Sequence, residues 1–89
     1  MRYVFDPAKD TANLEKHGVS LALAEVLFVG PHVTFRDDRF EYGEVREVAF
    51  GLIRERVFVC VYADRGEDRR VISLRKANSR EVKKYGQTP

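Results

Sequence analysis

The stretch Val57-Phe58-Val59-Cys60-Val61-Tyr62 is continuously apolar. A run of this length and composition is typical of a central β-strand that is buried on both faces. The stretch Arg70-Val71-Ile72-Ser73-Leu74-Arg75 alternates apolar and polar residues, which predicts a neighbouring strand. Because only a short turn around Gly66 separates the two, we expect an antiparallel hairpin at the centre of the fold.

Three further strands are predicted on the N-terminal side of this hairpin. A tight turn at Arg54-Glu55 joins the nearest one to the central strand. A polar turn, Arg36 to Arg39, follows the strand predicted at residues 32–35. The stretch from there to Gly43 shows no clear hydrophobic period. In chain order the predicted strands cover residues 2–5, 32–35 and 45–53.

The first predicted helix has recognisable ends. Asp6 can accept hydrogen bonds from the free amides of the first turn, and Pro7 suits the first helical position. The helix is expected to run to His17, and Gly18 supplies the left-handed residue that ends it.

Two more helices follow from similar signals. Ser20 is expected to cap a mostly buried helix from Leu21 to about Val29. Asn78 and Glu81 form a capping-box pattern that opens a last short helix. The order β-α-α-β-β-β-β-α predicts an α+β fold, with a small antiparallel sheet, two N-terminal helices and one short C-terminal helix.

Composition sets limits on the class of protein. The 89 residues are 44% hydrophobic and 34% charged, which predicts one globular domain over residues 1–89 and excludes a disordered chain. A single cysteine, Cys60, excludes an internal disulfide and a zinc site built on cysteines. Since the sequence has neither a membrane-length apolar run nor a signal peptide, we expect a soluble, cytoplasmic protein that does not bind membranes.

Charge is distributed unevenly along the chain. Residues 1–45 hold five basic and eight acidic side chains, a net charge of −3, whereas residues 46–89 hold eleven and six, a net charge of +5. A positive C-terminal half suits an anionic partner such as nucleic acid. A solvated basic face is the alternative.

The last predicted strand provides the first candidate site residues. A period of two places Ser73 and Arg75 on one face with Val71, and Arg70 on the core face with the remaining apolar residues. An arginine on the uncovered face can clamp a phosphate through two hydrogen bonds. The alternative for Arg75 is a solvent-facing residue or an ion pair with a partner.

Other candidates lie near strand and helix ends. Arg65 follows the central strand and can border the same anion site, or be an ordinary turn residue. Glu44 and Arg46 share a strand face, as a base beside a cation or as a surface salt bridge. His17 suits acid–base chemistry near neutral pH, or it interacts with the helix dipole.

Several kinds of catalytic site are missing from the sequence. It has no Gly-rich phosphate loop, no Ser-His-Asp arrangement and no carboxylate cluster able to hold Mg²⁺. An enzyme of this composition acting on nucleic acid is therefore expected to need no metal and no other cofactor. That favours attack by an RNA 2′-hydroxyl on its own phosphate, which requires only a base, an acid and cations.

The chain also resembles the BrnT toxin family. The motifs that carry the resemblance span nearly the whole chain: Phe5-Asp6, Lys16-His17-Gly18-Val19-Ser20, Gly43-Glu44-Val45-Arg46, Arg70-Val71-Ile72-Ser73-Leu74-Arg75-Lys76-Ala77 and Tyr85. Two positions depart from the family pattern, since Phe5 stands where Trp is common, and Arg65 does not follow the usual Thr-x-Arg ending.

The resemblance implies a RelE-like fold and a metal-independent endoribonuclease toxin of a type II toxin–antitoxin system, which inhibits translation and growth by cutting RNA. It also implies a BrnA-type ribbon-helix-helix antitoxin, in a complex of two toxins and two antitoxins, that contacts operator DNA through the antitoxin. The competing interpretation is a non-catalytic module that binds RNA, or binds the antitoxin as a co-repressor.

Residue by residue, the resemblance points to two sets of side chains, for which we hypothesise the following roles. In the first, Glu44 or His17 acts as the base, and cations stabilise the charge that develops on the phosphate. This catalytic set is Lys16, His17, Glu44, Arg46, Arg65 and Arg75. The second set holds the flanking RNA: Arg70, Ser73, Lys76 and Tyr85.

Overall fold

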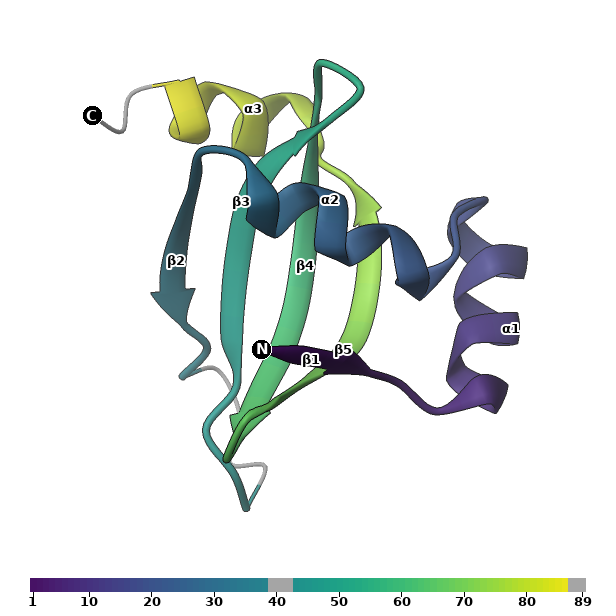
Figure 1. The fold of residues 1–89 in the computed structure, drawn as a ribbon. Coiled ribbons are helices and arrows are strands. Elements are labelled where there is room, and N and C mark those ends of the chain that lie inside the picture. The colour runs from purple at the N-terminus through teal and green to yellow at the C-terminus, as the bar shows by residue number, and fades with distance from the viewer. Residues whose placement is uncertain (39–42, 87–89) are drawn as a thin grey trace.

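The protein folds around one five-stranded sheet (Figure 1). A computed structural model describes residues 1–38 and 43–86, so that Arg39, the last residue of the predicted polar turn, lies outside the described residues. The strand order is β1-β5-β4-β3-β2. The strands are β1 (Arg2–Val4), β2 (His32–Arg36), β3 (Glu47–Ile53), β4 (Arg56–Arg65) and β5 (Asp68–Lys76).

The sheet is mixed, which corrects the prediction of an antiparallel sheet. Neighbours from β2 to β5 pair antiparallel, as the short turns between β3, β4 and β5 require. The first strand, however, pairs parallel with the last, with Arg2 opposite Asp68 and Val4 opposite Arg70. The hairpin argument applies only to strands that follow one another, and β1 is separated from β5 by most of the chain.

The helices begin and end close to their predicted residues. Helix α1 (Pro7–His17) is capped by Asp6, which accepts from the Ala8 amide at 2.9 Å, and it ends at Gly18 with φ 75°. The second predicted helix is divided into a 3₁₀ turn, η1 (Leu21–Leu23), and α2 (Ala24–Val29). A 3₁₀ turn is frequent at a helix N-terminus, where it satisfies free backbone groups. Among the described residues, no helix combines the length and apolar character needed to span a membrane.

The two faces of the sheet are covered unequally. Figure 1 shows α2 crossing one face, α1 standing beside β5, and the C-terminal helix α3 (Ser79–Gly86) at one end of the sheet. The first face packs against η1 and α2 around Leu21, Leu27, Phe58 and Tyr62. We call the other face, which carries Val61, Ser73 and Arg75, the open face. Phe50, Val57 and Val59 form a small buried cluster there, under α3.

A β-bulge in β5 corrects the predicted period of two. Val61 pairs with Ser73, but the next residue, Tyr62, pairs with Val71, so Ile72 has no opposite residue on β4. One extra residue in a strand reverses the facing of everything before it. Val71 is therefore buried in the core with Leu74, and Arg70, predicted to share the core face, lies on the open face.

Asn13 fixes α1 against the edge of β5. Strand β1 pairs with β5 only as far as Arg70, which leaves the edge of β5 at Leu74 without a neighbouring strand. The buried Asn13 amide replaces that neighbour, donating to the Leu74 carbonyl at 2.8 Å and accepting from the Leu74 amide at 3.1 Å. It also donates to the Val19 carbonyl at 3.0 Å. The C-terminal end of α1 is thereby held beside the last residues of β5.

The predicted capping box of the last helix is confirmed. The Glu81 amide donates to the Asn78 side chain at 2.8 Å, and the Asn78 amide donates to the Glu81 carboxylate at 2.9 Å. Because this reciprocal pair fixes the first turn of α3, it also fixes where the Glu81 carboxylate lies.

Candidate active site

A carboxylate with three guanidinium groups lies at one end of the open face. Glu44 forms ion pairs with Arg65 at 3.3 Å, with Arg46 at 3.9 Å and with Arg70. We call these four residues the Glu44 cluster. Side chains of Glu44 and Arg46 are 22% exposed, whereas that of Arg65 is 80% exposed. The cluster therefore has a largely buried carboxylate and an exposed outer guanidinium that a ligand can reach.

Three separate segments bring the Glu44 cluster together. Glu44 and Arg46 lie just before β3, Arg65 ends β4, and Arg70 lies near the start of β5. Arg70 reaches the open face because of the bulge, and it sits opposite Ala63 in the ladder. A small pocket of about 130 Å³ adjoins the cluster, lined by Val4, Glu44, Ala63, Arg65, Asp68 and Arg70.

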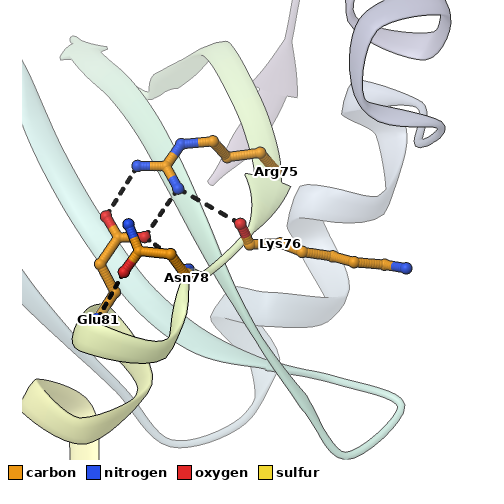
Figure 2. Close-up of polar contacts among 4 residues, drawn as sticks. All are labelled: Arg75, Lys76, Asn78 and Glu81. Atoms are coloured by element: carbon orange, nitrogen blue, oxygen red, sulfur yellow. Dashed lines mark hydrogen bonds and ion pairs between the residues drawn. The ribbon is translucent and has the colours of Figure 1, made fainter.

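Arg75 lies on the same face at the other end, clamped by α3. Its guanidinium donates two hydrogen bonds of 2.8 Å to the Glu81 carboxylate and one of 3.3 Å to the Lys76 carbonyl (Figure 2). The Arg75 guanidinium lowers the pKa of Glu81, and the Asn78 amide adds to this effect. Arg75 is 38% exposed, so it remains accessible to a ligand that competes with Glu81.

A groove of about 290 Å³ runs beside the Arg75–Glu81 pair. Its apolar floor is formed by β3 and β4, including Val59 and Val61. Polar walls come from residues that the sequence did not single out as site residues: Arg36, Asp37, Asp38, Glu81 and Lys84. Of these five residues, Glu81 was the one marked by a sequence pattern, because it forms a capping box with Asn78 three residues before it.

The Glu44 cluster and the Arg75–Glu81 pair, which we call the two stations of the open face, are well separated. Arg65 ends β4, while Arg75 pairs with Val59 six residues earlier on that strand. At about 3.3 Å per residue, about 20 Å lies between the two positions. Ser73, opposite Val61, lies between them. Arg65 and Arg75 therefore lie at opposite ends of the open face.

His17 and Lys16 lie at the C-terminal end of α1, next to β5. His17 is half-buried, and its pKa is lowered by burial first and then by the positive charges of Lys16 and Arg75. A lowered pKa keeps the imidazole neutral, as a general base requires. Lys16 is exposed. These two residues belong to the Arg75 end of the molecule and not to the Glu44 cluster.

Lys76 and Tyr85 are placed differently from the other predicted residues. The Lys76 side chain extends away from the Arg75–Glu81 pair (Figure 2) and lines a pocket on the opposite face of the sheet. Tyr85 packs against the small cluster under α3, and its hydroxyl donates to the Pro31 carbonyl at 3.2 Å. Its ring is thus engaged in packing that holds α3 near β2.

The fold and the site together define a small α+β protein whose open face presents several arginines, each held by a carboxylate. Phosphate groups can exchange with those carboxylates, because guanidinium binds both in the same two-pronged geometry. Comparison with protein-family models identifies the family of the chain. The chain belongs to the BrnT family of ribonuclease toxins of type II toxin–antitoxin systems, whose model matches residues 5–81. No curated protein sequence matches the chain significantly.

Proposed function

We propose that this protein is a metal-independent endoribonuclease toxin, a single domain of RelE-like fold whose open face cuts RNA. Membership of a ribonuclease toxin family supports the reaction class. The observation that carries the assignment of the site is the Glu44 cluster, where one carboxylate lies among three guanidinium groups on an uncovered sheet face. A base beside clustered cations is what cleavage by an RNA 2′-hydroxyl needs.

In the proposed reaction, Glu44 takes the proton of the 2′-hydroxyl. The 2′-oxygen then bonds to the adjacent phosphorus, and the bond from phosphorus to the 5′-oxygen breaks. A general acid or water returns a proton to that leaving oxygen, which gives a 2′,3′-cyclic phosphate and a 5′-hydroxyl. Arg65 and Arg70 stabilise the phosphorane, and Arg46 orients Glu44. Arg75, about 20 Å away along the strands, holds another phosphate of the same RNA.

His17 is the second candidate for the base. Its lowered pKa and its position near Arg75 give a neutral imidazole beside a cation. In that case the scissile phosphate lies at the Arg75 station, with Lys16 nearby, and the Glu44 cluster holds a flanking phosphate. Ser73 is proposed to contact the flanking RNA in either case. Lys76 and Tyr85 are left out of this role, because Lys76 lines a pocket on the opposite face of the sheet and the Tyr85 ring packs under α3.

Partners follow from the same proposal. A type II toxin–antitoxin family implies a protein antitoxin and an RNA target. We propose that the antitoxin is of the BrnA ribbon-helix-helix type, that two copies of each protein assemble, and that operator DNA is contacted only through the antitoxin. Cleavage is then blocked until the antitoxin is removed.

The alternative is a module that binds RNA or the antitoxin without cutting. This alternative is supported by the ion pairs Arg75–Glu81 and Arg69–Asp64, because each arginine already has a carboxylate partner within the chain. Such a module keeps its cationic face and its affinity for RNA. Cleavage, and not binding, separates the two functions.

The test is incubation of the purified, antitoxin-free protein with total RNA in excess EDTA. Variants Glu44→Gln and His17→Asn are compared with the wild type, and Arg80→Ala serves as a matched control at an exposed arginine. We expect cleavage in EDTA and a loss of roughly 10²- to 10⁴-fold in Glu44→Gln, as for removal of a general base. If His17→Asn loses activity to this extent and Glu44→Gln does not, His17 is the base and the scissile phosphate lies at the Arg75 station.

Two outcomes oppose the proposal itself. Equal cleavage by all four proteins indicates a contaminant or another site. Intact RNA in every lane, including a repeat on translating ribosomes, favours the binding module.

A further inference from the structure

A pocket of about 320 Å³ opens on the face of the sheet opposite the open face. It lies between the end of α1, the 3₁₀ turn η1 and the hairpin that joins β3 to β4. Its walls are aliphatic, from Val19, Leu23 and Ile53, and Phe58 closes the floor. We call it the hairpin pocket.

Three cations surround the hairpin pocket. Arg54, Arg56 and Lys76 line it, all three are exposed, and no carboxylate is among its lining residues. Within the described part of the chain, none of these three side chains makes an ion pair or a hydrogen bond. The contrast with the open face is sharp, because Arg65 and Arg75 there are each held by a glutamate.

The hairpin turn that contains Arg54 and precedes Arg56 has a costly backbone conformation. Ile53 pairs with Arg56, so Arg54 and Glu55 form a two-residue turn, with φ of 51° and 65°. Glycine or asparagine normally fills these left-handed positions, since a side chain there costs on the order of 1 kcal/mol. Strain of this kind tends to persist where a surface has a use.

We propose that the hairpin pocket is the docking site of the protein antitoxin, and that it takes an acidic segment with one aliphatic side chain. This inference rests on the proposed function, which supplies an antitoxin as the partner. The three unpartnered cations select an acidic segment, and the aliphatic walls select a leucine-like anchor. A nucleotide base fits less well, because stacking needs an exposed ring and Phe58 is only 5% exposed.

The location gives this contact an inhibitory consequence. Gly18 lines the pocket, so a bound segment lies directly beside Lys16 and His17 at the end of α1. It also engages Lys76, the neighbour of Arg75 in β5. The antitoxin thereby covers the α1 edge of the RNA path without filling the open face.

The experiment is an NMR titration of the ¹⁵N-labelled full chain with three probes. The first is a short peptide of aspartate and glutamate around one leucine, the second is the same peptide with serine in place of leucine, and the third is single-stranded oligouridine. We expect the leucine peptide to shift the amides of Val19, Ile53 and Phe58. The serine peptide should bind roughly tenfold more weakly, because the buried aliphatic side chain is lost.

Charge reversals test the rim. Arg54→Glu and Arg56→Glu should each weaken the leucine peptide roughly fivefold to tenfold, whereas Arg80→Glu, on α3, should leave binding unchanged. The spectra also show that each variant is folded. Three outcomes overturn the proposal. Oligouridine shifts the pocket amides and the leucine peptide does not, both peptides bind equally, or no probe causes a shift.

RNA cleavage in EDTA by the same variants is measured in parallel. If the wild type does not cleave RNA but binds the leucine peptide, the result counts against the proposed function alone. Cleavage without peptide binding counts against the docking site alone.

Discussion

Replacing Asn13 with alanine tests whether one buried amide joins α1 to the sheet. Asn13 is 7% exposed and makes hydrogen bonds to the Leu74 amide, the Leu74 carbonyl and the Val19 carbonyl. The two bonds to Leu74 are buried, and a buried group left without its partner costs about 1–3 kcal/mol. The third, partly buried bond adds about 1 kcal/mol. Together these contributions predict a loss of about 3–7 kcal/mol in the free energy of unfolding for Asn13→Ala.

Such a loss is a large fraction of the total stability, so equilibrium unfolding detects it readily. A chain of 89 residues has a total stability of about 4–13 kcal/mol. For a domain of this size each 1 kcal/mol shifts the Tm by about 4–8 °C, so the melting temperature should fall by at least about 12 °C. Urea titration followed by circular dichroism gives the free energy directly, with the m-value as a check on two-state behaviour.

Asn78→Ala is the matched control, because it removes the same amide at an exposed helix cap. Loss of that cap should cost about 1 kcal/mol. If Asn13→Ala proves no more destabilising than Asn78→Ala, the Asn13 amide does not replace a missing strand at the edge of β5, and the reasoning fails.

Three further predictions concern packing and pH. Gly51→Ala should destabilise by about 1–3 kcal/mol, because its new Cβ would lie 2.8 Å from Leu27, whereas Gly30→Ala meets open space; equal Tm values contradict this. Glu81→Gln should cost about 1 kcal/mol near neutral pH. Because the folded-state pKa of Glu81 is lowered, its contribution is present above the ordinary pKa of 4.5 and is lost as pH falls through the folded value. The difference in stability between the two proteins, measured by urea titration, should therefore shrink as pH falls below 4.5. For His17, whose pKa is lowered in the fold, the unfolded chain binds more protons just below pH 6.5, so wild-type stability should fall more steeply from pH 7.5 to 5.5 than that of His17→Asn.

Local chemistry made the ends of elements predictable from the sequence. Asp6, Gly18 and the Asn78–Glu81 pair act within a few residues of themselves, so their caps could be identified before any tertiary contact was known. The central hairpin was equally accessible, because the apolar run and the Arg54-Glu55 turn are both local features.

Non-local features could not be predicted in the same way. The parallel pairing of β1 with β5 joins opposite ends of the chain, and no pattern within either segment specifies it. The bulge at Ile72 leaves the local alternation intact while reversing the facing of Arg70. For the same reason the sequence joined Glu44 with Arg46, but not with Arg70, whose contact depends on that bulge.

Under the proposed function, the arrangement of charge gives the open face a way to distinguish an RNA strand from a single phosphate. The whole chain carries a net charge of only +2. On the open face, Glu44 forms ion pairs with Arg65 and Arg70, and Glu81 forms one with Arg75. Each phosphate that binds must displace a carboxylate already in place, so a single phosphate gains little net interaction energy. A strand that reaches both stations gains from several exchanges within one binding event, because the second station is then met at high effective concentration. Under the proposed function, these ion pairs therefore favour an extended RNA strand over a single phosphate.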